Sequence, residues 1–349
     1  MKKTLQWLII VLVLGALLEI GLLTFKQLIP KEKQQVKIGM VLYNEQDPFI
    51  RKTVTYIQSY LETLNQELPV EVSLEFKDSA HDQKLQNQQI SSWIETGYDL
   101  LIVNMVERED ASMIIDKAQN ANVPLIFFNR EPVPQDIARW KKIAYVGSRA
   151  EEAGIIQGKM LADALDEGLE VDKNQDSKIQ YVMLEGEYGH QDAILRTYYC
   201  IKTLEERGYI MDNLATDTAL WQRDAGKEKM LEWYERFGDK IEVVMANNDE
   251  MALGAIEVLK EKGYFQEGQM IPVLGVDGLD EALKAMEEGT LLGTVLNDAK
   301  EQARCILYKA YDLLELPISD TLVPETQTDS QYLWVRHIPL KNNTLEDKK

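Results

Sequence analysis

Asparagine and aspartate residues directly follow four apolar segments of this chain of 349 residues. The segments 124–128, 243–246, 272–276 and 293–296 end at Asn129, at Asn247, Asn248 and Asp249, at Asp277, and at Asn297 and Asp298, respectively. If these segments are strands of open parallel sheets, their carboxyl ends border the ligand crevice. Amides and carboxylates supply paired donors and acceptors but no nucleophile. We therefore predict a binding site for a neutral, hydroxyl-rich small molecule such as a sugar.

A second set of polar side chains follows the apolar segment 179–184. Asp192 and Arg196 are four residues apart, so on a helix they lie on one face, and His190 stands just before them. These groups would present donors and an acceptor to a ligand at a helix start; a surface ion pair beside a loop histidine is the alternative. No Ser or Cys stands in a nucleophile-elbow pattern, which argues against a catalytic triad.

Two aromatic residues stand where loops are expected. Phe49 follows Asp47 and Pro48 after the first apolar segment, and Trp221 precedes a helical pattern. Either ring alone is compatible with a place in a hydrophobic core. Flat amphipathic rings also suit the lining of a cleft and pack against the apolar faces of a pyranose, so a ring from each half of the chain could sandwich one sugar.

The segment 172–180 has the spacing of a calcium-binding loop. Oxygen donors stand at positions 1, 3, 5, 7 and 9, the seventh being a main-chain carbonyl. These positions are Asp172, Asn174, Asp176, Lys178 and Gln180. Ser177 replaces the usual glycine at position 6 and Met183 the usual glutamate at position 12. The missing carboxylate would have to come from elsewhere, and Glu242 is the natural candidate; an acidic turn without a metal is the alternative.

Apolar segments alternate with amphipathic helical patterns from residue 36 onward. The first series of expected strands comprises 36–43, 70–76, 100–103, 123–128 and 143–146, and the second comprises 179–184, 243–246, 273–276 and 291–295. Helical patterns between them include 49–64, 83–95, 192–207, 251–262 and 280–287. Strands separated by helices of this length predict βαβ units and parallel sheets. Two such series predict an α/β fold of two doubly wound, Rossmann-like parallel-sheet lobes with a cleft between their strand ends.

Three hinge crossovers are expected to join the lobes, near residues 147–148, near residue 297 and around residues 329–334. The segment 298–313 is predicted to be a helix that returns to the first lobe. Residues 36–147 and 297–330 are accordingly assigned to the first lobe, and residues 148–296 and 331–341 to the second, which carries the loop 172–180. Residues 342–349 form a polar tail.

The N-terminal segment indicates targeting. Lys2 and Lys3 precede a mostly apolar run over residues 5–25, about as long as a bilayer core requires. No small-x-small cleavage pattern and no cysteine for lipid attachment is visible. Residues 1–30 are therefore expected to be a signal peptide or an uncleaved membrane anchor, and residues 31–35 a tether. The positive flank places the rest of the chain outside the cytoplasm.

Composition limits the partners. Hydrophobic residues make up 45% of the chain, enough for a substantial core. The net charge of −20 argues against nucleic acid or an anionic membrane surface as a partner, since both need a basic face. Cys200 and Cys305 lie far apart and are expected to be buried packing residues. Three histidines without paired spacing argue against zinc.

Taken together, these residues resemble the periplasmic galactose/glucose-binding protein family of bacterial sugar transporters, which has the type I periplasmic binding protein fold. The resemblance spans roughly residues 36–340 and rests on Tyr43, 47–49, 127–132, 189–192, Arg196, 217–221, 246–249, 275–277 and 293–298. It implies that Phe49 and Trp221 stack on the two faces of a hexose. The polar contacts it implies are Asp47, Asn129, Arg130, His190, Asp192, Arg196, Asn248, Asp277 and Asn297. The structural Ca²⁺ it implies would be held by Asp172, Asn174, Asp176, the Lys178 carbonyl, Gln180 and Glu242.

The leading hypothesis is a non-enzymatic, extracytoplasmic monomer that closes two lobes around D-galactose or D-glucose and is read by the permease of an ABC transporter. The alternative is a membrane-tethered receptor that reports sugar occupancy to a sensor kinase or chemoreceptor. A sugar-responsive repressor sharing the lobes would need an N-terminal helix-turn-helix, which the sequence lacks. A glycosidase is the enzymatic alternative and would need two carboxylates placed across a glycosidic bond.

Overall fold

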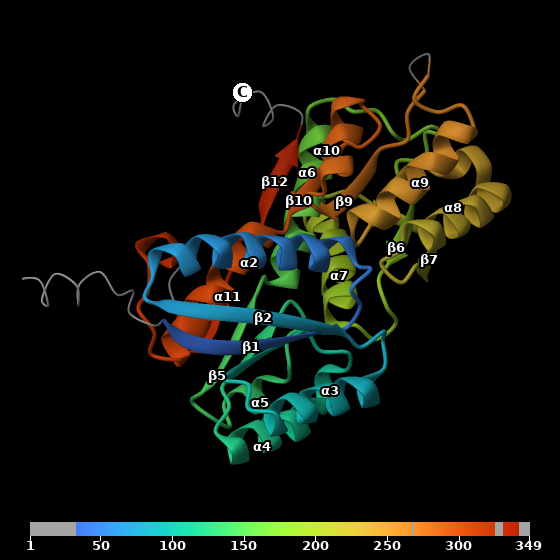
Figure 1. Cartoon of the computed structure of the whole chain (residues 1–349). Coiled ribbons are helices and arrows are strands. Elements are labelled where there is room, and N and C mark those ends of the chain that lie inside the picture. Colours follow the sequence, from blue (N-terminus) through green and yellow to red (C-terminus); the bar gives the residue numbers. More distant parts are fainter. Residues whose placement is uncertain (1–32, 267–268, 325–330, 342–349) are drawn as a thin grey trace, which may run out of the picture.

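The computed structural model describes residues 33–266, 269–324 and 331–341, which form two α/β lobes, each built on a six-stranded sheet (Figure 1). The predicted fold of two parallel-sheet lobes is confirmed. The predicted signal or anchor segment 1–30 and the tail 342–349 lie outside the described residues. Within the described ranges, no helix combines the length and the apolar character needed to cross a membrane.

The first sheet has the strand order β11-β5-β4-β3-β1-β2, and all its neighbouring strands are parallel. Its strands are β1 (Gln34–Leu42), β2 (Val70–Asp78), β3 (Leu100–Val103), β4 (Leu125–Phe128), β5 (Ile143–Gly147) and β11 (Tyr332–Trp334). The helices of this lobe are α2 (Pro48–Glu67), α3 (Gln83–Glu95), η1 (Arg108–Asp110), α4 (Ala111–Ala121), α5 (Pro134–Ile137), α11 (Ala299–Leu313) and η3 (Asp320–Leu322).

The second sheet has the order β12-β10-β9-β8-β6-β7 and is parallel except for β12, which runs antiparallel to β10. Its strands are β6 (Ile179–Glu185), β7 (Met211–Thr218), β8 (Val243–Ala246), β9 (Val273–Asp277), β10 (Gly293–Leu296) and β12 (Ile338–Lys341). The helices of this lobe are α6 (Ala150–Asp166), α7 (Gln191–Glu206), α8 (Arg223–Phe237), η2 (Gly238–Lys240), α9 (Asp249–Glu261) and α10 (Asp280–Glu287).

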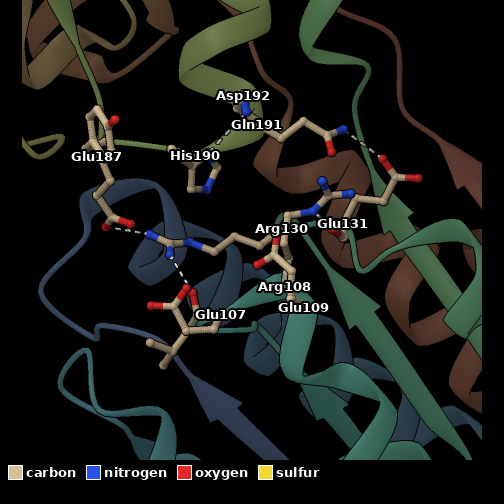
Figure 2. A pocket seen from close by; sticks show the side chains of 12 residues that line it. Glu107, Arg108, Glu109, Arg130, Glu131, Glu187, His190, Gln191 and Asp192 are labelled. Carbon is tan, nitrogen blue, oxygen red and sulfur yellow. Dashed lines mark hydrogen bonds and ion pairs between the residues drawn. The ribbon is translucent and has the colours of Figure 1, made fainter.

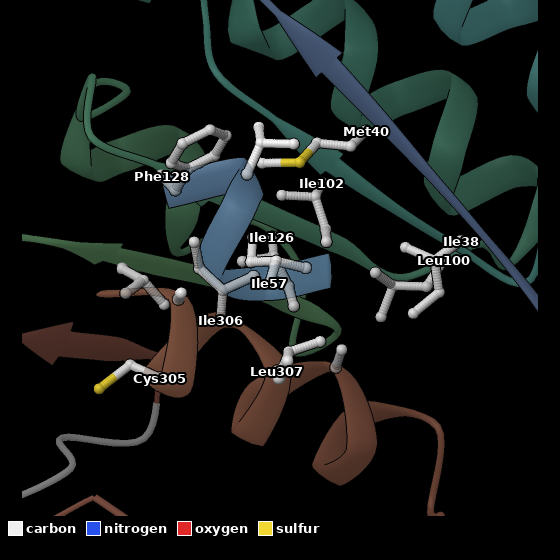
Figure 3. Packing of buried hydrophobic residues seen from close by; sticks show 14 of the residues in the cluster. Ile38, Met40, Ile57, Leu100, Ile102, Ile126, Phe128, Cys305, Ile306 and Leu307 are labelled. Carbon is white, nitrogen blue, oxygen red and sulfur yellow. The ribbon is translucent and has the colours of Figure 1, made fainter. Parts of the chain in front are cut away.

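Helices cover both faces of each sheet, which explains why the central strands are apolar throughout. On one face of the first sheet, Ile57 of α2 and Ile306 of α11 pack against strand residues such as Ile102 (Figure 3). On the opposite face, α3 and α4 supply the covering layer. Cys305 and Cys200 are fully buried in the cores of the first and second lobes, respectively, so their predicted packing role is confirmed.

The chain crosses between the lobes at residues 148–149, 297–298 and 335–337. The assignment of residues 331–341 to the second lobe is wrong for β11, which pairs with β5 in the first sheet. The reason is a local anchor: Gln331 donates from Nε2 to the carbonyls of Ile137 and Trp140 at 2.8 Å, both in the first lobe. The predicted tether 31–35 is also too long, because β1 begins at Gln34.

Strand β7 was not predicted from the sequence. Its residues, MDNLATDT, are largely polar, and every one of them is partly or fully exposed. An edge strand needs to bury little of its surface, so it lacks the apolar signal of a central strand. The core strands were predictable because burial on both faces demands apolar residues at consecutive positions.

Candidate functional site

All eleven residues predicted to bind the ligand line one cavity between the lobes, which we call the inner cavity. The lining residues are Tyr43, Asp47, Phe49, Asn129, Arg130, His190, Asp192, Arg196, Trp221, Asn248, Asp277 and Asn297. The cavity has a volume of about 30 Å³, far below the roughly 300–1,000 Å³ of ordinary ligand pockets. The lobes are therefore closed on each other in this structure.

Asp47 is fixed at the start of α2. Its Oδ1 accepts hydrogen bonds from the backbone N–H groups of Phe49 at 2.8 Å and Ile50 at 3.1 Å, which makes it the N-cap. Its Oδ2 accepts a short hydrogen bond from the Tyr43 hydroxyl. Burial raises the pKa of Tyr43 well above its usual range, and the nearby Asp47 carboxylate acts in the same direction, so this hydroxyl remains a donor.

Asn129 adopts a left-handed conformation (φ 59°) directly after β4, which asparagine tolerates better than most residues. Asn104 donates to its Oδ1 at 3.2 Å, and the Tyr145 hydroxyl donates to its backbone carbonyl at 2.9 Å. With the side-chain oxygen occupied, the Asn129 amide offers its N–H groups to the inner cavity.

Arg130 connects the two lobes. Its guanidinium carbon lies 3.5 Å from the centroid of the Tyr43 ring, Nη1 donates to the Val106 carbonyl at 3.1 Å, and Nη2 donates to Glu187 Oε1 at 2.7 Å. Burial by itself lowers the pKa of Arg130, but interactions with Tyr43 and Glu187 outweigh burial and raise it. The residue is therefore a permanently charged donor that links β4 of the first lobe to the second.

His190 caps α7 and is a neutral donor. Its Nδ1 accepts from the backbone N–H of Asp192 at 3.1 Å, which leaves the proton on Nε2. Burial, reinforced by Arg130 and Arg196, holds the pKa of His190 well below its usual range. Its ring meets that of Trp221 edge to face, with the centroids 5.3 Å apart.

The Asp192–Arg196 pair lies in the cleft and not on the surface. Arg196 Nη2 stands 3.5 Å from Asp192 Oδ2, and the two side chains are only 5% and 15% exposed. Arg196 Nη1 donates to the Asn247 carbonyl at 2.7 Å. Burial raises the pKa of Asp192 even though Arg196 opposes it. The alternative of a surface ion pair is thereby excluded.

The Trp221 ring packs directly against the backbone of Gly186. A Cβ on Gly186 would fall 2.0 Å from the Trp221 ring, so glycine at that position makes room for it. Trp221 itself has φ 63°, and its carbonyl accepts from Asn248 Nδ2 at 3.1 Å. Asn248 in turn caps α9 through a 3.1 Å bond from Met251 N–H to its Oδ1. The ring and the amide are therefore positioned by each other.

Asn297 stands at the second crossover. Its Oδ1 accepts from Gln302 Nε2 at 2.7 Å and from Ser148 Oγ at 3.1 Å, so its N–H groups face the inner cavity and Asp277. Burial raises the pKa of Asp277 well above its usual range. Ser148 and Gln302 were not predicted, because nothing in their sequence neighbourhoods reveals contacts across about 150 residues of chain.

The remaining polar residues at the strand ends do not line the inner cavity. Asn247 donates to Thr197 Oγ1 at 3.1 Å, and Asp298 caps α11. Asp249 is fully buried, where its Oδ1 accepts from Thr294 Oγ1 at 2.6 Å and its Oδ2 from the Leu279 N–H at 2.9 Å. The strand ends thus serve the architecture of the second lobe as well as the cavity.

The oxygen-bearing side chains of loop 172–180 gather around one another. Asp172 accepts from the N–H groups of Asp176 and Ser177 at 3.2 and 2.9 Å, and Glu242 accepts from those of Lys173 and Gln180 at 2.6 and 2.9 Å. Ser177 has φ 64°, the conformation for which glycine is usual at this position.

A hard cation suits this donor set, which contains oxygen and no sulfur or imidazole. The amides of Asn174 and Gln180, however, donate to Asp176 at 3.2 and 2.9 Å and would have to turn to present their oxygens. Among the described residues, no group of three or more His, Cys, Asp or Glu is arranged to hold a metal ion. The calcium prediction therefore stays a prediction.

Further contacts join the lobes beside the inner cavity (Figure 2). Gln191 of α7 donates to Glu131 Oε2 of the first lobe at 3.1 Å. Lys52 of α2 lies 2.8 Å from Asp280 of α10. Together with the Arg130–Glu187 pair, these contacts join the first lobe to the second.

The family model of the periplasmic binding protein domain matches residues 38–316. A D-galactose/methyl-galactoside binding periplasmic protein of Haemophilus influenzae is 35% identical over 280 residues, which cover 80% of this chain and 82% of the relative. A putative rhizopine-binding protein of Rhizobium meliloti is 33% identical over 236 residues, covering 67% and 71% of the two chains.

Solved structures share the architecture. An ABC transporter solute binding protein from Bacillus halodurans with bound myo-inositol superposes with a TM-score of 0.74 at 25% identity, covering 91% of this chain and 98% of the other. A periplasmic component of an arabinose ABC transporter from Shewanella has the same TM-score of 0.74 at 19% identity, which supports the fold alone.

Proposed function

The chain belongs to the periplasmic binding protein domain family, the sugar-binding components of ABC transporters, and on that basis we propose that it binds D-galactose or D-glucose between its lobes and delivers the sugar to a membrane permease. Members of this family bind solutes and are not enzymes, which sets the glycosidase alternative aside. The observation that carries the choice of a hexose is the inner cavity, where two aromatic rings and planar polar groups from both lobes converge.

The polar groups of the inner cavity suit a neutral ring with many hydroxyls. Arg130, Asn129 and the Nε2–H of His190 act as donors, whereas Asp47 and Asp277 act as acceptors. Each ligand hydroxyl can both donate and accept, so it can bridge a donor and an acceptor. A wrong epimer would leave a buried group unpaired, at a cost of about 1–3 kcal/mol. The identity of the hexose as galactose or glucose is part of the proposal, and the galactose is supported by the 35% identical D-galactose/methyl-galactoside binding protein of Haemophilus influenzae.

Closure of the lobes would couple binding to delivery. The sugar enters while the lobes are apart, and the contacts between Arg130 and Glu187, Gln191 and Glu131, and Lys52 and Asp280 form as the hinge closes. The permease would then read a surface that exists only when both lobes are in register. An apolar run over residues 5–25 supports tethering at the membrane, which would also suit the alternative role of a sugar sensor.

Calcium binding at loop 172–180 is a second part of the proposal. The ion would be held by Asp172, Asn174, Asp176, the Lys178 carbonyl, Gln180 and Glu242. It would offset two of the three negative charges of the carboxylates and tie the segment before β6 to the start of β8. Support comes from the spacing of the donors and from the Asp172 carboxylate, which accepts two backbone N–H groups of its own loop.

Titration of the full-length chain with a monosaccharide panel tests the proposal. The protein should be held in a detergent without a sugar headgroup, because a glycosidic detergent would compete. We expect heat release and a change in Trp221 fluorescence with galactose or glucose, and weaker responses to ribose and xylitol. If neither galactose nor glucose gives heat release or a fluorescence change, the proposal is wrong.

A further inference from the structure

His337 stands in the third crossover, between β11 of the first sheet and β12 of the second. Its side chain is fully buried (0% exposed), yet neither ring nitrogen has a hydrogen-bond partner in the part of the chain that the structure describes. A buried polar group without a partner costs free energy, and few such groups occur in folded proteins. An apolar ring would fill the same space without this cost, so the imidazole needs another explanation.

The charged side chains that act on the His337 ring come from two helices of the second lobe. Glu152, in the first turn of α6, accepts from the backbone N–H of His337 at 3.1 Å, and its Oε2 lies 3.5 Å from the ring Nδ1. Asp192 and Arg196 of α7 also act on the ring electrostatically, and Arg336 is its neighbour in the chain. Because Asp192 and Arg196 line the inner cavity, the charge of His337 is coupled to the site of ligand binding.

The ring is neutral while the lobes are closed. Burial lowers the pKa of His337 and Arg196 acts in the same direction, whereas Glu152 and Asp192 oppose this shift without reversing it. Histidine is the side chain whose charge ordinarily changes between about pH 5 and 8. In the closed state, a proton therefore binds to His337 only at a lower pH than an exposed histidine requires.

Separation of the lobes would change the surroundings of the ring. The third crossover joins an edge strand of each sheet, so its backbone has to adjust when the two sheets move apart. Asp192 and Arg196 border the inner cavity, so water can enter beside them once the cleft opens. A hydrated imidazole holds a proton at a higher pH than a buried one. A proton on His337 therefore stabilises the open state relative to the closed state.

We propose that His337 is a pH-sensitive switch in the hinge, whose neutral form permits closure of the lobes and whose protonated form favours the open state and release of the ligand. This inference rests on the proposed binding of a hexose between the lobes. Because the pKa of His337 is lowered in the closed state, its contribution to closure is complete above the ordinary range of histidine and is lost as the pH falls below that range. The loss amounts to at most about tenfold per pH unit for one proton.

The first experiment compares the pH dependence of hexose affinity in the wild type and in His337→Gln, which keeps a polar but neutral side chain. Calorimetric titrations of the full-length chain run from about pH 7.5 to pH 5. The affinities should agree within about twofold at the upper end, and the wild type should lose roughly tenfold more than the variant at the lower end. Protonation of His190 in the inner cavity would weaken binding in both proteins, so the difference between them reports on His337.

Two results of this experiment are decisive in different ways. Equal pH profiles of the wild type and His337→Gln overturn the switch and leave hexose binding intact. Failure of the wild type to bind hexose at the upper end of the pH range overturns the proposed function instead. The matched control is His81→Gln in the first lobe, because His81 Nδ1 lies 3.8 Å from Glu187 Oε1 of the second. A proton on His81 would attract Glu187 and favour closure, so this variant should lose affinity at low pH at least as steeply as the wild type.

The second experiment follows the His337 proton directly in the wild-type protein. The imidazole signal is recorded by NMR on histidine-labelled chain and assigned by its absence from His337→Gln. Its titration midpoint should lie roughly one pH unit lower with saturating hexose than without. A purely structural role of the ring would leave the midpoint unchanged by the ligand, and an unchanged midpoint overturns the switch.

Discussion

At the scale of single residues, the inner cavity depends on side chains whose orientation is fixed by other side chains. Asn129 and Asn297 both have their oxygens occupied by donors from within the protein, so both present N–H groups to the inner cavity. The sequence made the cavity residues themselves predictable, because polar residues at strand ends and aromatic residues in loops stand out locally. It did not reveal Gln302, Ser148 or Asn104, since a polar residue in a helix or loop has no local sign of a distant partner.

Trp221 is expected to supply a large share of the binding energy. Replacing it with alanine removes one apolar face of the clamp, and burial of a large side chain is worth about 1.5–3 kcal/mol. Trp221→Ala should therefore weaken hexose binding roughly 10- to 100-fold in a calorimetric titration. Trp140→Ala, in the first lobe and outside the inner cavity, is the control and should leave the affinity unchanged. An affinity for Trp221→Ala within twofold of the wild type would argue against stacking.

Asp249 should make the second lobe less stable as the pH rises. Burial raises the pKa of its carboxyl to about 7 in the folded protein, whereas in the unfolded chain it titrates near 4. Between these values the unfolded state releases the proton first, so the contribution of this group to stability is present at low pH and is lost as the pH approaches 7.

Asp249→Asn removes this titration. The free energy of unfolding of the variant, relative to the wild type, should rise by roughly 2–4 kcal/mol between pH 4 and pH 7. Urea denaturation at several pH values measures the difference, and the exposed Asp224→Asn on the same lobe is the control. A difference that does not change with pH would place the pKa of Asp249 near its ordinary value.

At the scale of elements, the strands that are buried along their whole length were the ones that the sequence predicted well. Strands β3, β4 and β8 are short apolar runs that are buried at every position, and they were located from the sequence within two residues. Strands β7 and β11 were not, because β7 is a polar edge strand and β11 is a three-residue strand placed by Gln331. The loop 172–180 is intermediate. The spacing of its oxygen donors could be read from the sequence, but whether it binds a metal ion could not.

Calcium should stabilise the second lobe through this loop. At a free Ca²⁺ concentration 100-fold above Kd, the ion would add about 2.7 kcal/mol, and each kcal/mol shifts Tm by roughly 2–4 °C at this lobe size. The melting temperature should therefore fall by several degrees when a chelator is added. Asp172→Asn should abolish this response, and Asp212→Asn on neighbouring β7 should preserve it. If neither calcium nor chelator changes the melting temperature, the loop is a turn that binds no metal ion.

Ser177→Gly is an independent test of calcium binding by the loop 172–180. Because Ser177 already adopts φ 64°, glycine would relieve the backbone without changing any donor. We expect tighter calcium binding in this variant than in the wild type, measured by a competing fluorescent chelator. Weaker binding would mean that the Ser177 side chain contributes something that the backbone conformation does not explain.

At the scale of the whole molecule, we expect the equilibrium between open and closed lobes to set the affinity for the ligand. The Arg130–Glu187 pair is the least exposed of the cross-lobe ion pairs, with side chains 6% and 23% exposed, compared with 31% and 89% for Lys52–Asp280. A hydrogen bond to a charged group is worth about 1.5–3 kcal/mol when shielded, whereas an exposed pair contributes about 0–1 kcal/mol. The two contacts should therefore differ in their effect on closure.

Glu187→Gln should weaken hexose binding about tenfold or more, because the pair forms only in the closed state. The melting temperature without ligand should change little. Lys52→Gln is the matched comparison and should cost less than about fivefold. Calorimetry gives the affinities, and small-angle X-ray scattering with and without sugar reports closure. A larger effect for Lys52→Gln than for Glu187→Gln would contradict this ranking.

The outermost strand on one side of each sheet comes from the end of the chain. Strands β11 and β12, within residues 331–341, complete the first and second sheets, respectively. During synthesis, neither lobe can therefore close its sheet until this segment has emerged from the ribosome. In each sheet this edge strand is the last one to be made, after the five strands to which it is added.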